Sequence, residues 1–272
     1  MSNTHYLEIT TIAGCKVNCS YCPQGLFGLE HKKVSDDRMM SLELFKKCLK
    51  TVPTNVDIYF AGYSEPFLNL NIMTMIRHAH EKGHSVSLYS TLVGMTIEHV
   101  QQLERLFLYK FHVHLPDDGK YMRVDIDEEF LAVLDAIKNS SILNVNWINY
   151  FGLHPKVEAL VGEEWLADWK LTSRAGNVEQ DYLPKIVRHE GPIWCTQGRL
   201  IKNVLLPNGE VALCCVDFGR KHIIGDLTTD AYADLHKSKS FLDIIDRMNS
   251  DANDLLCRTC EWAEPITNKM LD

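Results

Sequence analysis

Three cysteines near the N-terminus, Cys15, Cys19 and Cys22, lie in the segment ITTIAGCKVNCSYCPQG. Their spacing is CxxxCxxC, and Gly14 and Gly25 flank them, so the segment can form a tight loop that turns the sulfurs inward. Three thiolates can each bind a different iron of one [4Fe-4S] cube, whereas ordinary cubane sites use four cysteines. The spacing therefore predicts a cluster whose fourth iron is left for a substrate or a cofactor.

A structural zinc site is the alternative for these thiols, because zinc often takes ligands from two separated C-x-x-C pairs. The pair Cys257 and Cys260 could be the second one. The position of the CxxxCxxC loop directly after a predicted strand favours the iron–sulfur cluster.

The composition limits the class of protein. The net charge of −8 argues against a nucleic-acid surface, because phosphate contacts need clustered Lys and Arg. The first residues, MSNTHYLEITT, carry no export signal, and no apolar run is long enough to span a bilayer, so we expect a cytosolic protein without a membrane partner. Disulfides are rare in such reducing compartments, so the nine cysteines favour metal ligands or catalytic groups.

A second set of cysteines lies in the C-terminal third of the chain. Four thiolates from a hairpin and a distal pair would complete a cubane site, and we expect them to be Cys195, Cys214, Cys257 and Cys260. Cys215 follows Cys214 directly and would face the other side of its strand, because side chains alternate. Cys48 lies on the apolar face of a predicted helix and is expected in the core.

Alternating strands and helices must position these groups. Strands are predicted at 5–11, 55–61, 85–90, 110–115, 143–151 and 168–174, and helices at 41–52, 72–82, 96–107 and 127–139. Repeated strand–helix units predict a parallel α/β fold. Six units are too few for a complete eight-stranded barrel, so we expect a partial (β/α)6 TIM-like barrel, with a doubly wound sheet as the alternative.

The pattern changes after Gly176, so we expect a barrel over 1–176 and a small appended domain over 177–272. Pro207-Asn208-Gly209 predicts the turn of a β-hairpin within 201–217. Two short helices are predicted at 231–238 and 240–248, ahead of the last cysteine pair.

The N-terminal loop, CxxxCxΦC with Tyr21 before the last cysteine, resembles the signature of radical S-adenosylmethionine enzymes. The resemblance implies that Cys15, Cys19 and Cys22 hold a [4Fe-4S] cluster whose fourth iron is chelated by S-adenosylmethionine. One-electron reduction would then produce a 5′-deoxyadenosyl radical. A flavodoxin or ferredoxin-type reductant is implied as a partner.

Two further motifs are similar to sites that bind S-adenosylmethionine in this family. AGYSEP resembles its GGEP turn, with Tyr63-Ser64 where a second glycine is common, and implies binding of the methionyl ammonium by Gly62, Ser64, Glu65 and Pro66. Ser90 and Thr91 match family hydroxyls that touch the ribose, although Leu92 replaces the usual asparagine.

The second cysteine set resembles the twitch domain, the shortened SPASM domain with one auxiliary [4Fe-4S] cluster. Gly209, followed after four residues by Cys214, favours Cys214 as the ligand. Cys215 is then either a buried structural residue or a hydrogen-atom donor. Zinc at this set remains the alternative.

Polar residues at strand ends are the candidates for substrate binding, because ligands bind at the carboxyl ends of parallel strands. His112 and His114 share one face of a predicted strand, and a histidine there could take a proton. Asn144 and Ser173 are further candidates. Arg174 resembles the arginine of a similar stretch in the family's twitch-type dehydrogenases; it would orient a hydroxyl or carboxylate rather than act as a base.

The resemblance and the second cysteine set together imply an oxidoreductase that acts on a hydroxylated small molecule, a sugar or an aminocyclitol. The auxiliary cluster would accept the electron of the substrate radical. A sugar epimerase or dehydratase is an alternative, with Cys215 returning a hydrogen atom in the epimerase. A peptide maturase is a second alternative, which is less favoured because the chain begins directly at the first strand. A zinc-bound interaction module is a third.

Overall fold

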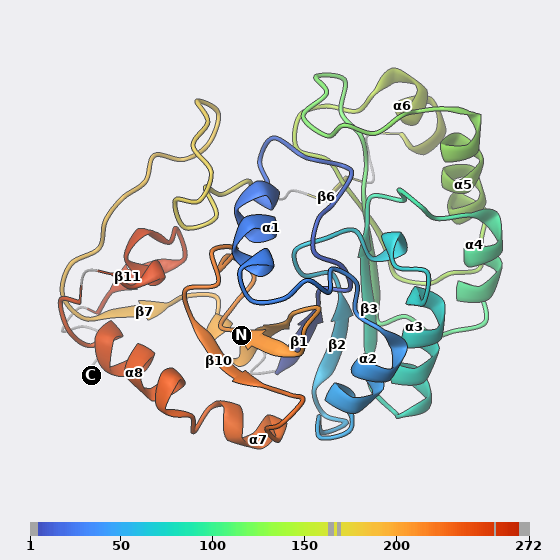
Figure 1. Cartoon of the computed structure of the whole chain (residues 1–272). Helices are drawn as coiled ribbons and strands as arrows, with labels where there is room; N and C mark the ends of the chain where they lie inside the picture. Colours follow the sequence, from blue (N-terminus) through green and yellow to red (C-terminus); the bar gives the residue numbers. More distant parts are fainter. Residues whose placement is uncertain (1–4, 163–165, 168–169, 253, 267–272) are drawn as a thin grey trace.

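The central feature is a parallel sheet in the computed structural model, which describes residues 5–162, 166–167, 170–252 and 254–266. Its strands run in sequence order (Figure 1): β1 (Tyr6–Ile9), β2 (Asp57–Phe60), β3 (Val86–Ser90), β4 (Lys110–His114), β5 (Val145–Ile148) and β6 (Leu166–Ala167). Every adjacent pair among them is parallel. The predicted partial barrel is confirmed, and this sequential order differs from that of a doubly wound sheet.

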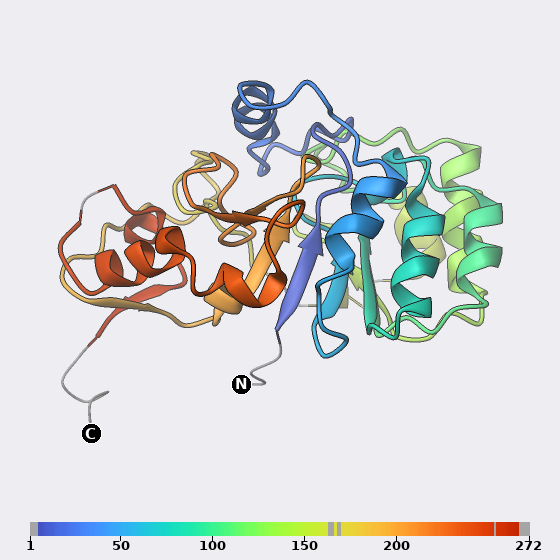
Figure 2. The same cartoon turned by 60° about the horizontal axis from the view of Figure 1, so that its bottom comes forward.

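Helices follow the strands of the sheet. They are α1 (Gln24–Lys32), α2 (Leu42–Leu49), α3 (Ile72–Glu81), α4 (Ile97–Leu103), α5 (Glu128–Lys138) and α6 (Pro155–Val161). Helices α2 to α6 cover the outside of the sheet, whereas α1 lies over the strand ends beside the cysteine loop (Figure 2). Ser41, Thr96 and Asp127 cap α2, α4 and α5, each accepting a hydrogen bond from a backbone N–H in the first turn. The sequence analysis missed α1 and α6, although α1, with nine residues, is longer than the predicted α2 and α4.

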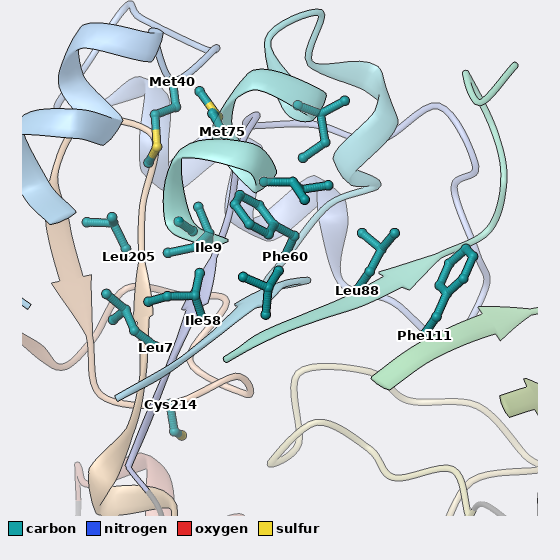
Figure 3. Packing of buried hydrophobic residues seen from close by; sticks show 14 of the residues in the cluster. Leu7, Ile9, Met40, Ile58, Phe60, Met75, Leu88, Phe111, Leu205 and Cys214 are labelled. Carbon is teal, nitrogen blue, oxygen red and sulfur yellow. The ribbon is translucent and has the colours of Figure 1, made fainter. Parts of the chain in front are cut away.

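Strand alternation separates a helix-facing core from the barrel interior. Leu7 and Ile9 of β1 and Ile58 and Phe60 of β2 are fully buried against the helices (Figure 3). Because successive side chains point to opposite faces, Glu8 of β1 faces into the barrel.

The C-terminal part continues the same sheet. Strand β8 (Lys202–Leu205) pairs in parallel with β1, and β9 (Glu210–Ala212) and β10 (Ile223–Asp226) add to it antiparallel. The predicted hairpin is thus confirmed. The third strand, β10, was not predicted. Figure 2 shows this part beside β1, on the side away from α3, α4 and α5.

A second, smaller sheet lies in the C-terminal part. It pairs β7 (Ile193–Cys195) with β11 (Ala263–Pro265), antiparallel. The two predicted helices are present as α7 (Tyr232–Leu235) and α8 (Lys239–Met248), and a short 3-10 helix, η3 (Leu256–Thr259), precedes the last cysteine. The boundary near 176 stays a prediction, because the described main sheet runs across both parts.

The sixth strand was predicted in the wrong place. Residues 168–169 of the predicted run 168–174 lie outside the described residues, 170–173 form a loop and Arg174 begins a turn. Strand β6 is Leu166–Ala167, just before that run. Among the described residues, no helix combines the length and the apolar character that crossing a bilayer requires.

Candidate active site

A cavity of about 260 Å³ lies at the barrel interior, between the cysteine loop and the C-terminal part. Its lining includes Cys15, Cys19 and Cys22 from the loop, together with groups from β1, β2, β3 and β4. The three thiols of the predicted cluster loop therefore meet at one cavity, although they come from an irregular segment.

The cysteine loop is held by contacts on both sides. Ser20 N donates to the Tyr121 carbonyl at 2.9 Å, and the Ala13 carbonyl accepts from Arg38 Nε at 3.0 Å. Tyr21 is buried against Tyr150 and Phe151. Burial raises the pKa of the Cys22 thiol to about 11, so in the free protein this sulfur is protonated and a metal must displace its proton.

Glu65 ties the turn after β2 to the end of β3. Its Oε1 accepts from Phe67 N at 3.1 Å and from Ser90 Oγ at 2.8 Å. Its Oε2 accepts from Thr91 N at 2.6 Å and from Thr91 Oγ1 at 2.7 Å. A carboxylate has about four acceptor directions, so these donors already fill them. Glu65, Ser90 and Thr91 are therefore hydrogen-bonded to one another, and the Glu65 carboxylate has no acceptor position left for a ligand.

Ser64 is the group of this turn with bonding capacity left. Its hydroxyl is buried, lines the cavity and has no hydrogen-bond partner among the described residues. Gly62 also lines the cavity and has φ of +63°, while Pro66 begins the short 3-10 helix η1 (Pro66–Leu68). Ser64 and the backbone of this turn thus remain the candidates to bind a methionyl ammonium.

Tyr63, in the Tyr63-Ser64 pair that stands where a second glycine was expected, links the residue after β1 to the second cysteine set. Its hydroxyl donates to the Cys214 carbonyl at 2.7 Å, and its ring packs on Phe218 at 4.3 Å between centroids. Its backbone N–H donates to Thr10 Oγ1 at 3.0 Å. A glycine could not make the hydroxyl and ring contacts.

The second cysteine set lines a separate, smaller cavity. Cys195 ends β7, Cys214 follows β9, and Cys257 and Cys260 lie in and directly after η3. All four border the cavity. Four sulfurs around one buried space suit a [4Fe-4S] cube. Cys215 borders the larger cavity instead, so the two neighbours face different cavities as expected. The expected reason was wrong, because both follow β9, Cys214 in a bend and Cys215 in a turn.

Arg199, which the sequence analysis did not single out, lies between the two cavities and lines both. Its Nη1 donates to Cys215 Sγ at 2.7 Å and to the Tyr6 hydroxyl at 3.2 Å, and lies 3.8 Å from Glu8 Oε1. Its guanidinium stacks over the Trp262 ring at 4.1 Å, and its backbone N–H donates to Cys195 Sγ at 3.4 Å. Arg199 and Trp262 therefore form the partition between the cavities.

The barrel-facing residues of the first strands were also missed. Tyr6, Glu8, Tyr59 and Tyr89 line the cavity. Tyr6 and Glu8 lie two residues apart on β1, and Glu8 is level with Tyr59 on β2. Their signal in the sequence is a polar or aromatic residue between fully apolar ones, as in Leu7-Glu8-Ile9.

Of the substrate candidates, Arg174 and His114 lie at the cavity. Arg174 Nε is buried and has no hydrogen-bond partner among the described residues, as a ligand-binding arginine requires. Burial, with Arg174 and His112 nearby, lowers the pKa of His114 to about 3, and burial lowers the pKa of His112 to about 4. Both imidazoles are therefore neutral and weakly basic at pH 7.

His112, Asn144 and Ser173 do not line this cavity. The His112 ring packs on Tyr89 at 4.3 Å between centroids. The Asn144 amide donates to the Leu108 carbonyl at 3.1 Å, and Ser173 Oγ accepts from Gly176 N at 2.9 Å. The sequence analysis expected Asn144 and Ser173 to bind a ligand. In the structure their side chains are hydrogen-bonded to the backbone of neighbouring loops instead.

Family models match both parts of the chain. Residues 9–159 match the radical SAM superfamily. The chain belongs to this superfamily. Residues 195–261 match the SPASM iron–sulfur cluster-binding domain. The protein is thus a radical SAM enzyme whose cofactors are S-adenosylmethionine, the [4Fe-4S] cluster that binds it and an auxiliary iron–sulfur cluster.

Solved structures share the fold at low sequence identity. BtrN in complex with AdoMet and 2-DOIA is 20% identical, with 94% of this chain and 92% of that one covered and a TM-score of 0.65. Native anSMEcpe with bound AdoMet and Cp18Cys peptide is 15% identical, with 94% and 86% covered and a TM-score of 0.57. Streptococcus suis SuiB bound to precursor peptide SuiA is 11% identical, with 94% and 69% covered and a TM-score of 0.58. No curated protein matches the sequence.

Proposed function

We propose that this radical SAM enzyme is a dehydrogenase that converts a carbinol of a sugar or aminocyclitol into a ketone. One observation carries the proposal: the smaller cavity, lined by Cys195, Cys214, Cys257 and Cys260, adjoins the larger one. Among the described residues, Arg199 and Trp262 line both. An auxiliary cluster held there would be a one-electron acceptor beside the substrate. This position suits an oxidation.

Cys15, Cys19 and Cys22 would hold the cluster that binds S-adenosylmethionine, and together these cofactors would supply hydrogen abstraction by a 5′-deoxyadenosyl radical. Ser64 and the turn around Gly62 would hold the methionyl group, and Thr91 would reach the ribose. The cavity is enclosed by Tyr6, Tyr59, Tyr89 and Tyr150, whose hydroxyls and ring faces suit a polyol.

Arg174 would orient the substrate through its guanidinium, since a guanidinium stays protonated and cannot act as a base. His114 would accept a hydrogen bond in its neutral form. Its lowered pKa makes it a poor proton acceptor at neutral pH, which differs from the role expected for a histidine here.

An epimerase is the second candidate, because Cys215 Sγ borders the same cavity and a thiol can return a hydrogen atom. Peptide modification is a third, since anSMEcpe and SuiB have the same fold and bind peptides. The tyrosine-lined interior favours a small substrate over a peptide.

The test is anaerobic reconstitution with a panel of sugars and aminocyclitols and a flavodoxin or ferredoxin-type reductant. Substrate-dependent 5′-deoxyadenosine, with a product lighter by two hydrogens, would support dehydrogenation. Unchanged product mass with solvent deuterium incorporated would replace it with epimerisation. The proposal places the enzyme in the reducing cytosol, where its cysteines would stay out of disulfides and available to the clusters.

A further inference from the structure

Glu8 is the buried carboxylate of the cavity that the proposed chemistry has not used. It lies at the middle of β1, between the buried Leu7 and Ile9, and its side chain lines the larger cavity. Its Oε1 is 3.8 Å from Arg199 Nη1, and Gly62 and Cys215 line the same cavity. A carboxylate at this place can meet a substrate hydroxyl directly.

Charged and titratable groups face Glu8 from every neighbouring element. Arg199 precedes β8, and Arg174 comes from the loop after β6. The remaining groups are phenols, a thiol and one amine: Tyr6, Tyr59, Tyr63, Tyr89, Cys215 and Lys202. Burial raises the pKa of Glu8, and the two arginines oppose that rise. Burial is the larger effect, and a shift of either cation would change the proton affinity of Glu8.

Arg199 connects this carboxylate with the auxiliary site. The same guanidinium that pairs with Glu8 also donates to Cys215 Sγ and stacks on Trp262, and the Arg199 backbone N–H donates to Cys195 Sγ. Extra negative charge at the four-thiol cavity would attract the guanidinium and weaken its hold on Glu8. Glu8 would then bind a proton more tightly.

We propose that Glu8 accepts the proton of the substrate hydroxyl, and that Arg199 couples this protonation to electron uptake by the auxiliary cluster. The proposal rests on the dehydrogenation proposed above. The carbinol radical breaks its O–H bond, the proton binds a Glu8 carboxylate oxygen, and a C=O bond forms. The one electron released goes to the auxiliary [4Fe-4S] cluster, the oxidant of the step.

The coupling can be measured without a substrate. The cluster-loaded protein is titrated under argon at several pH values between 6 and 9, with the auxiliary cluster followed by electron paramagnetic resonance. If one proton accompanies one electron, its midpoint potential falls by about 59 mV for each pH unit, the value for a tenfold change in a one-electron equilibrium. We expect this slope over part of the range in the wild type and a flat response in Glu8→Gln.

The matched control is Glu210→Gln. Glu210 lies on β9 and is also paired with an arginine, Arg220, but it borders neither cavity. Its replacement should leave the slope unchanged. Equal slopes in the wild type and Glu8→Gln would overturn the proposal. A flat wild-type response would do so as well, even if the Glu8 variant failed to load its clusters.

Failure of the proposed function has a different signature. If no member of the sugar and aminocyclitol panel is oxidised while the slope depends on Glu8, dehydrogenation is rejected and the proton–electron coupling stands. With an oxidised panel member labelled by deuterium at the carbinol, Glu8→Gln should still transfer deuterium into 5′-deoxyadenosine while ketone formation falls at least tenfold. Undiminished ketone formation by that variant would reject Glu8 as the proton acceptor.

Discussion

Replacing Glu65 by glutamine should cost more than the small change in shape suggests. Each carboxylate oxygen accepts a hydrogen bond from a backbone N–H, Phe67 N at 3.1 Å for one and Thr91 N at 2.6 Å for the other. In either orientation of a glutamine amide, its NH₂ group faces one of these N–H donors. A buried N–H then loses its acceptor.

The expected size follows from these contacts. An unsatisfied buried donor costs about 1–3 kcal/mol, and hydrogen bonds to a charged acceptor contribute about 1.5–3 kcal/mol each. Because relaxation recovers part of this, we expect Glu65→Gln to lower the free energy of unfolding by about 3 kcal/mol. S-adenosylmethionine should also bind more weakly, since the turn that carries Ser64 loses its link to β3.

The assay is urea denaturation of the cluster-loaded protein under argon, followed by circular dichroism, with equilibrium dialysis for S-adenosylmethionine. Thr91→Val is the matched control, because it removes one hydroxyl donor and keeps the Thr91 N–H bond to Glu65. Its loss should be about 1 kcal/mol. A loss below about 0.5 kcal/mol for Glu65→Gln, the size of an ordinary surface substitution, would refute the reasoning.

Three other outcomes are expected. Cys257→Ala should lose roughly half of the iron, one [4Fe-4S] cube of two, whereas Cys215→Ala should keep it all, by iron assay after reconstitution; equal iron in both variants would contradict the assignment. Gly62→Ala should lower the melting temperature, because a Cβ at φ of +63° would lie 2.1 Å from a hydroxyl at the end of β1, whereas Gly25→Ala, whose Cβ meets nothing within 4 Å, should not. Burial lowers the pKa of His112 to about 4, so the unfolded chain binds a proton that the folded protein does not. The free energy of unfolding should therefore fall by about 1–2 kcal/mol as the pH falls from 6.5 to 5. His112→Gln should lessen that acid sensitivity in denaturation curves at the two pH values, and an unchanged sensitivity would show that this histidine titrates normally.

The parallel barrel could be predicted because its signals are local. Buried strands and amphipathic helices repeat along the chain, and helix caps such as Ser41 and Thr96 precede the apolar runs. The prediction of the sixth strand was wrong because it also relied on local signals, and Leu166–Ala167 is too short to show any periodicity. The strand β10 was missed since nothing in its own residues indicates pairing with β9.

The cysteine spacing determined by itself which thiols belong together, because three ligands on one short loop cannot separate in space. Which face each strand residue takes also follows from alternation, as for Leu7, Glu8 and Ile9 of β1. Only the tertiary structure decided what stands between the two sites. Arg199 meets Glu8, Cys215 and Trp262 because β8 pairs with β1 and β11 pairs with β7, and such pairings between distant segments leave no pattern in the sequence.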